Sequence, residues 1–213
     1  MNRAAVPRVT QFDEADATRV TALRQQYKAD YEQRGTRLTL TPFLVKAVAE
    51  TLHKHPALNA SLDARGENLV LKLYVHIGVA VDTEAGLMVP VLRDADKKSL
   101  IEVSRELEEL AKKARERTLT AEDMKGGTFT ISNQGGIGGG HFTPIVNLPE
   151  AAILGVGRGA VKPAWVDGQV EPRTLVPLAL SYDHRLVDGG AAARFITDLV
   201  KAIEQFPETL VKP

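Results

Sequence analysis

The apolar positions in the first part of the chain predict a strand followed by two helices. Residues 6–13 alternate polar and apolar side chains, which is typical of a short strand. Residues 17–33 then place apolar or aromatic side chains at helical spacing, and Gly35 ends this helix. Thr41 followed by Pro42 predicts the N-cap and the first position of a second helix, which Pro56 ends.

The middle of the chain predicts a hairpin and a charged helix. Residues 69–81 are rich in β-formers, residues 87–92 form a second apolar run, and residues 82–86 between them are typical of a hairpin loop. Ser99 and Glu102 have the spacing of a capping box. The helix that follows places apolar side chains on one face and opposite charges about four residues apart on the other.

The last third of the chain predicts buried strands and one more helix. Residues 128–132 form a strand that enters a glycine-rich loop, residues 135–140. The runs 151–161 and 174–181 predict long apolar strands on either side of a tight turn at Asp167-Gly168, and Gly189-Gly190 opens an amphipathic helix. Because several strands are apolar on both faces, we expect an α/β sandwich with helices on one face and a partner or second sheet layer on the other.

Composition narrows the possible functions. The 213 residues include 27 Lys and Arg and 27 Asp and Glu, and this zero balance argues against a nucleic-acid partner bound through bulk positive charge. Without an apolar run of about 18 residues, no membrane partner is expected. The N-terminus lacks a basic-then-apolar signal pattern, so a cytoplasmic location is expected. The absence of cysteine excludes disulfides, thiolate metal sites and a cysteine nucleophile.

Two residues could carry chemistry. His184 lies in a charged loop, residues 181–189, between a strand and a helix, and its imidazole suits proton transfer near neutral pH. Ser132 ends a strand beside flexible glycines, where a hydroxyl can point into a cavity and donate to an oxyanion. The alternatives are a charged surface turn for His184 and a turn-forming Ser-Asn pair for Ser132.

Other sequence patterns lack the neighbouring structure that a nucleotide or metal site would require. Residues 155–160 fit a loose G-x-G-x-x-A pattern, but no helix follows, and the 135–140 loop lacks the G-K-[ST] of a nucleotide site. His53 and His55 point to different faces of a helix, so a metal site there is not expected. His76 is interpreted as structural, and His141 as a solvated loop residue.

Several blocks of the chain together resemble one family. Residues 184–189 match the H-R-x-x-D-G signature of the 2-oxo acid dehydrogenase acyltransferases, the E2 components, and residues 127–133 are similar to their second active-site segment. Residues 9–16, 75–82 and 142–147 resemble further family blocks, in order and at family-like spacing. The subtype that the chain resembles most is the dihydrolipoamide acetyltransferase of bacterial pyruvate dehydrogenase.

The resemblance implies a fold and a reaction. It implies that residues 1–213 form an acyltransferase catalytic domain, a two-layer α/β sandwich resembling chloramphenicol acetyltransferase that assembles as trimers. His184 is then the general base, Ser132 the oxyanion donor, and Asp188 steadies the His184 loop through an ion pair. His184 and Ser132 come from different chains of the trimer. Coenzyme A and lipoamide are the implied substrates, with no metal and with the individual coenzyme A contacts unassigned.

The resemblance also implies partner proteins, some of which bind through domains that are not recognised in this chain. We expect a homotrimer that builds a cubic or dodecahedral cage. Lipoyl domains belong to the full-length protein, and the E1 and E3 enzymes bind through domains missing here. No lipoyl or subunit-binding domain is recognised, since residues 96–98 only superficially resemble a lipoylation site before a capped helix. The N-terminal arm, residues 1–8, is interpreted as shortened.

The C-terminal segment and the substrate leave alternatives open. In the family, an apolar tail such as residues 206–211 joins trimers into the cage, and a frayed terminus is the alternative. A branched-chain or succinyl acyltransferase of the same family, or a non-catalytic cage scaffold, are the alternative functions.

Overall fold

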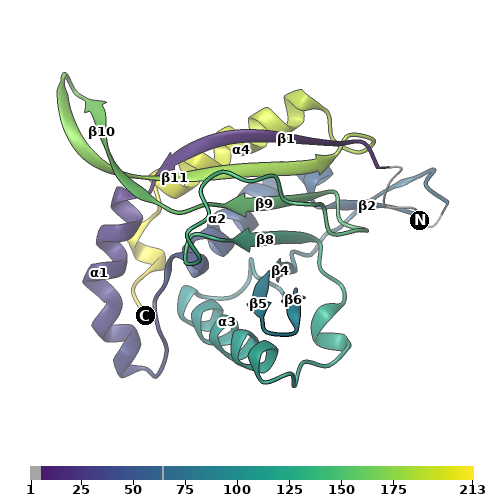
Figure 1. The fold of residues 1–213 in the computed structure, drawn as a ribbon, viewed down its shortest axis with the longest axis horizontal. Helices are drawn as coiled ribbons and strands as arrows, with labels where there is room; N and C mark the ends of the chain where they lie inside the picture. Colours follow the sequence, from purple (N-terminus) through teal and green to yellow (C-terminus); the bar gives the residue numbers. More distant parts are fainter. Residues whose placement is uncertain (1–5, 64) are drawn as a thin grey trace.

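A seven-stranded mixed sheet forms the centre of the structure, a computed structural model that describes residues 6–63 and 65–213 (Figure 1). Its strands are β1 (Arg8–Asp16), β4 (Ile77–Val79), β7 (Val91–Leu92), β8 (Phe129–Asn133), β9 (Ala152–Val156), β10 (Ala160–Val166) and β11 (Gln169–Asp183). They lie in the order β1, β11, β9, β8, β4 and β7, and β10 pairs with β11 as a hairpin. β8 runs parallel to both β9 and β4, whereas the other pairs are antiparallel.

Four helices and several short elements complete the described chain. The helices are α1 (Thr18–Gln33), α2 (Leu40–Lys54), α3 (Leu100–Arg115) and α4 (Gly189–Glu204), with short 3-10 turns η2 (Pro56–Leu58), η3 (Glu122–Met124) and η4 (Glu208–Leu210). Two small hairpins are β2 (Ala60–Leu62) with β3 (Leu69–Leu71), and β5 (Val81–Thr83) with β6 (Gly86–Met88). Within the described residues, no helix combines the length and apolar character that a bilayer crossing requires.

One face of the sheet forms the core with the helices. Strand β11 alternates, so that Leu178, Leu180 and Tyr182 are buried on the helical side, where Phe195 and Leu199 of α4 belong to the same cluster. All five side chains are at most 1% exposed. Burying one such side chain contributes roughly 1.5–3 kcal/mol to stability, so this contact holds the C-terminal end of β11 firmly in place. The predicted α/β sandwich is therefore confirmed.

The other face of the sheet is partly covered by a loop of the same chain. Residues 134–149 lie over β8 and β9, and a Cβ added to Gly155 would stand 2.9 Å from Phe142 Cζ and 3.1 Å from Pro144 Cγ. The Phe142 ring and Pro144 therefore approach the backbone of β9 at Gly155 more closely than a side chain there would allow. The expected cover was a partner or a second sheet layer; within the chain, a loop takes that place.

Two predicted boundaries are wrong. Helix α2 begins at Leu40 with Thr39 as its N-cap, so Pro42 occupies the third helical position. A proline is tolerated there because the first N–H groups of a helix lack intrahelical partners. The run 151–161 divides into β9 and β10, since the glycine-rich loop crosses at Gly157, where an added Cβ would lie 2.0 Å from the Gly140 carbonyl oxygen.

The C-terminal segment packs against its own chain. Phe206 and Val211 are 2% and 0% exposed. The Phe206 and Phe43 rings contact edge to face, with 5.0 Å between centroids, and Tyr31 Oη donates to the Val211 carbonyl oxygen at 2.9 Å. The alternative of a frayed terminus is therefore wrong. The role of residues 206–211 in joining trimers stays a prediction. Of the predicted N-terminal arm, residues 1–5 lie outside the described residues.

Short sequence motifs form a helix cap and turns where the sequence predicts them. Asp167 and Gly168 have φ values of 47° and 84° and join β10 to β11 as a two-residue turn. Ser99 accepts from the Glu102 backbone N–H, and Glu102 accepts from the Ser99 N–H, as the capping box requires. The hairpin predicted around residues 82–86 is present, but its turn is only Glu84 and Ala85, because Asp82, Thr83 and Gly86 pair within β5 and β6.

We expect Ser99→Ala to lower the free energy of unfolding by about 1 kcal/mol, because it removes the side chain that caps α3. Thr39→Ala is the matched control, since Thr39 is an N-cap whose side chain makes no capping hydrogen bond. Urea unfolding of both variants measures the difference. Equal losses in the two variants would show that the capping box contributes nothing.

Candidate active site

His184 begins a tight turn at the end of β11. Its backbone N–H donates to the Pro7 carbonyl oxygen at 2.9 Å, and the N–H groups of Leu186 and Val187 donate to the Asp183 carbonyl oxygen at 3.0 and 3.1 Å. The imidazole is exposed, 5.9 Å from the Tyr182 ring between centroids, and within the described residues it has no hydrogen-bond partner. A histidine so placed can exchange protons with a molecule that approaches the end of the sheet.

Asp188 caps the helix that follows this turn. Its Oδ1 accepts from the Ala191 N–H at 2.7 Å, and its carbonyl oxygen accepts from the Ala192 N–H at 3.0 Å. A carboxylate at a helix N-terminus is favoured by the helix dipole. The predicted ion pair of Asp188 is absent from the described residues, so the side chain steadies the loop by capping α4 instead.

The ion pair of this loop joins Asp183 to Arg185. The Asp183 side chain is 1% exposed, and Arg185 Nε donates to its two carboxylate oxygens at 2.9 and 3.1 Å. Arg185 Nη2 donates to Oδ2, and the Arg185 backbone N–H donates to Oδ1 at 3.0 Å. Donating these hydrogen bonds to the Asp183 carboxylate raises the pKa of the Arg185 guanidinium. The charged neighbours noted in the sequence thus pair with one another across His184.

Ser132 lies near the other end of the sheet. Its neighbour Ile131 is buried among the helices, so Ser132 faces the opposite side of β8, beside Gly155 in the register. The side chain is half-buried and its hydroxyl has no hydrogen-bond partner in the described chain. Asn133 secures the strand end, because its Nδ2 donates to Thr41 Oγ1 at 3.3 Å and its Oδ1 accepts from the Gly135 N–H at 3.0 Å.

One chain does not bring Ser132 and His184 together. Ser132 is in register with Gly155 of β9, and Gly155 with Ala179 of β11. His184 is five residues farther along β11, which is roughly 17 Å at the rise of an antiparallel strand, and β11 lies two strand spacings, about 10 Å, from β8. The hydroxyl and the imidazole therefore lie near opposite ends of the sheet.

A cavity lies beside each of these ends. A cavity of about 460 Å³ adjoins Asn133 and the loop residue Ile137, and one of about 330 Å³ adjoins Asp183 and Arg185. The sequence did not indicate either cavity, because each is lined by segments far apart along the chain. In the single chain, Ser132 does not line the first cavity and His184 does not line the second.

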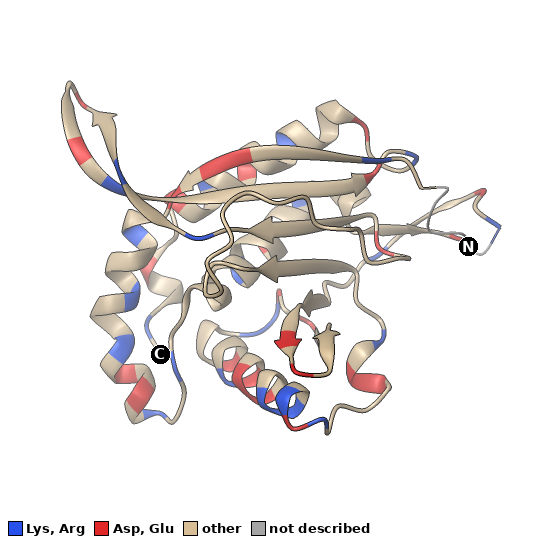
Figure 2. Cartoon of the chain, in the orientation of Figure 1, with Lys and Arg blue, Asp and Glu red and all other residues tan. Residues whose placement is uncertain are grey.

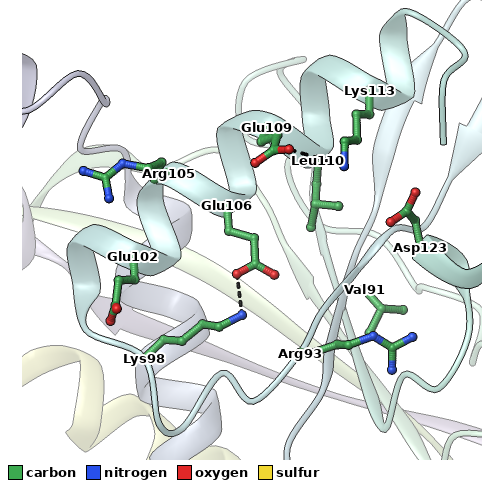
Figure 3. Close-up of a pocket in the computed structure, with 10 residues that line it drawn as sticks. All are labelled: Val91, Arg93, Lys98, Glu102, Arg105, Glu106, Glu109, Leu110, Lys113 and Asp123. Carbon is green, nitrogen blue, oxygen red and sulfur yellow. Dashed lines mark hydrogen bonds and ion pairs between the residues drawn. The ribbon is translucent and has the colours of Figure 1, made fainter. Parts of the chain in front are cut away.

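A third cavity, about 440 Å³, lies along α3 and contains none of the candidate residues (Figure 3). Four cationic and four anionic side chains line it: Arg93, Lys98, Arg105, Lys113, Glu102, Glu106, Glu109 and Asp123. Figure 3 shows Lys98 paired with Glu106 and Lys113 paired with Glu109. The formal charges of these eight side chains sum to zero, so the lining carries no net charge.

The remaining histidines have structural partners. His53 and His55 face Asp96 and Asp198, at 3.3 and 2.9 Å, and His76 Nδ1 accepts from the Asp94 N–H at 3.0 Å. The His141 ring contacts Phe12 edge-on, with 6.2 Å between centroids. Among the residues that the structure describes, no three His, Asp or Glu side chains are grouped to hold a metal ion.

Comparison with known proteins finds relatives along the whole chain. The family described as 2-oxoacid dehydrogenases acyltransferase (catalytic domain) matches residues 1–211. The dihydrolipoyllysine-residue acetyltransferase component of the pyruvate dehydrogenase complex of Haemophilus influenzae is 50% identical over 200 residues, which are 93% of this chain and 35% of that protein. Its counterpart from Cupriavidus necator is 48% identical over 210 residues, 99% of this chain and 38% of that protein. The chain thus spans little more than a third of these relatives.

Solved structures share the fold. The dihydrolipoamide acetyltransferase of Azotobacter vinelandii has a TM-score of 0.93 and 48% identity, over 98% of this chain and 86% of that one. Its report concerns a serine, a histidine 52 residues later and an asparagine four residues after that, in the catalytic mechanism. The cubic core of a pyruvate dehydrogenase complex matches with the same values. A chloramphenicol acetyltransferase, at 15% identity and a TM-score of 0.58 over 97% of this chain and 89% of that one, confirms the fold alone.

A buried carboxyl, Glu150, lies at the end of the sheet where His184 emerges. It is 3% exposed, and it accepts from Thr130 Oγ1 at 2.6 Å and from Asn147 Nδ2 at 3.0 Å. Burial raises the pKa of Glu150 to about 7, although both hydrogen bonds act in the opposite direction. The sequence did not reveal this group, because a glutamate after a loop proline is typical of a surface turn.

Glu150 should make stability fall as the pH rises. An unfolded glutamate releases its proton near pH 4.3, below the folded value, so between these values the folded state binds more protons. We expect the stability of the wild type, measured against Glu150→Gln, to drop by on the order of 3 kcal/mol between pH 4 and 8. Chemical unfolding across this range measures it, with Glu109→Gln as an exposed control. A constant difference between wild type and Glu150→Gln would contradict the buried, protonated carboxyl.

Proposed function

The chain belongs to the 2-oxoacid dehydrogenase acyltransferase family, and from this premise we propose that it transfers an acetyl group between dihydrolipoamide and coenzyme A. One observation carries the proposal. Ser132, His184 and Asp188 have the same separations, 52 and four residues, as the serine, histidine and asparagine of the Azotobacter vinelandii enzyme. Aspartate replaces asparagine here, and its carboxylate oxygen accepts a capping hydrogen bond that an amide oxygen could equally accept.

The reaction is a transfer between two thiols. A thiol with a pKa near 8.5 is mostly protonated at neutral pH, so a base must remove its proton as the sulfur attacks. In our proposal, the exposed His184 imidazole takes that proton while the sulfur bonds to the thioester carbonyl carbon. The carbonyl oxygen becomes an oxyanion, to which the Ser132 hydroxyl donates. When the intermediate collapses, the second sulfur leaves and takes the proton back from the imidazolium.

The separation of Ser132 and His184 supports a site shared between chains. Since one chain holds them near opposite ends of its sheet, we propose that His184 of one copy meets Ser132 of the next. Repeating this head-to-tail contact closes a ring, which fits the homotrimer expected from the sequence. The solved cubic core of a pyruvate dehydrogenase complex supports assembly of such trimers into a cage.

The other partners follow from the relatives. The lengths of the relatives beyond this chain leave room for the lipoyl and subunit-binding domains through which we propose that the E1 and E3 enzymes are engaged. The names of the relatives favour acetyl over succinyl or branched-chain transfer. A cytoplasmic location stays a prediction.

Removing either side chain should abolish most of the activity. We expect His184→Ala to reduce turnover roughly 10²–10⁴-fold through loss of the base. Ser132→Ala should cost roughly 10²–10³-fold through loss of the oxyanion donor. Steady-state assays with acetyl-CoA and dihydrolipoamide measure both effects, and thermal unfolding verifies that the variants fold. Near-normal turnover in both would end the proposal.

Co-expression of the two variants tests whether the site is shared. If His184 and Ser132 act from different chains, random assortment pairs an intact histidine with an intact serine in about a quarter of the sites, and activity returns to that level. If both act from one chain, every site carries one lesion and no activity returns. The assay compares the co-expressed protein with each variant expressed alone.

A further inference from the structure

The Tyr182 ring, 5.9 Å away between centroids, is the one aromatic contact of the His184 ring among the described residues. Within the described residues, no hydrogen bond holds either ring nitrogen, and the side chain is exposed. Its orientation therefore depends on the backbone that carries it. A base must lie within hydrogen-bond reach of its proton, and a displacement of about 1 Å can cost on the order of 10²-fold in rate.

That backbone is enclosed by the pair of Asp183 and Arg185. The Arg185 side chain folds back over residue 184, so that Nε, Nη2 and the backbone N–H all donate to the Asp183 carboxylate. Among the described residues, Arg185 donates the four hydrogen bonds that reach this carboxylate. A planar guanidinium in such a forked contact fixes direction as well as distance.

The residues on both sides of the pair are also anchored. The Asp183 N–H donates to the Ala151 carbonyl oxygen at 2.9 Å, and Asp183 is 1% exposed at the edge of the core. On the other side, Val187 is 1% exposed, packed in the core just before α4. His184 thus lies in a short turn between two anchored residues, with its side chain exposed.

We propose that the ion pair of Asp183 and Arg185 positions the His184 imidazole for proton transfer, an inference that rests on the proposed function. Neither residue touches the reacting atoms in this role; both act through the backbone of residue 184. If the ion pair were purely structural, it would contribute to folding stability alone. If Arg185 held substrate, its loss would weaken substrate binding.

A pair of variants separates these roles. Arg185→Met leaves a buried carboxylate unpaired, so stability and activity should both fall. In the double variant Asp183→Asn with Arg185→Met, the buried charge is gone and the melting temperature should recover. The turn stays unclamped in that protein, so kcat should remain at least about tenfold below wild type, with KM for acetyl-CoA and dihydrolipoamide within about twofold.

The control is another arginine–carboxylate pair on the same strand, whose carboxylate, Glu171, is 47% exposed where Asp183 is 1% exposed. Arg173 donates to Glu171, two residues away, at 2.7 Å, with 26% of its side chain exposed against 32% for Arg185. It lies on the part of β11 that pairs with β10, far from His184. Arg173→Met should leave kcat unchanged.

Three results would overturn the proposal. These are a wild-type kcat in the double variant, a loss that resides in KM, and an equal loss in Arg173→Met. If the double variant melts below wild type, Arg185→Lys is the deciding variant, because it keeps the positive charge but not the forked contact. The proposal then requires kcat to fall with KM unchanged. A wild-type kcat in Arg185→Lys rejects the positioning role of the ion pair. If His184→Ala itself retains activity, the proposed function fails instead, so the two failures are distinguishable.

Discussion

The direction of the strands around β9 is the constraint on which the candidate site depends. β8 and β9 run parallel and β11 runs against both, so the C-terminal end of β11 lies beside the N-terminal ends of its neighbours. A polar residue that ends β8 and one that follows β11 must then emerge near opposite edges of the sheet. Within one chain, the strand directions therefore keep Ser132 and His184 apart, and this separation is the basis of the site proposed between two copies.

Features that depend on neighbouring residues could be predicted from the sequence. The capping box of Ser99 and Glu102 and the turn at Asp167-Gly168 are each closed by hydrogen bonds or dihedral angles within a few residues. The start of α2 was placed at the wrong residue, because Pro42 is tolerated anywhere in the first turn and so does not identify the first position. Figure 2 shows why the sheet was recognisable: β8 and β9 carry no Lys, Arg, Asp or Glu, whereas α1 and α3 are densely charged.

Features that depend on distant segments could not be predicted. Local chemistry alone left His184 and Ser132 open between a site and a surface turn, and only the order of several family blocks favoured the site. Glu150 gave no signal, since its partner Thr130 is 20 residues away and its burial depends on the sheet. Phe142 lies on β9 only because Gly155 leaves space for it. The sequence shows both residues, but their contact is set by the path of the loop.

Two buried carboxyl groups lie near His184, Glu150 and Asp183, and their charges are stabilised differently. Glu150 has only a hydroxyl and an amide as partners, and burial without a cation favours its protonated form. Asp183 has a guanidinium directly against it, so its charge is balanced within two residues of the imidazole. An ion pair of this kind gives the turn a rigid contact that adds no net charge beside the proposed base.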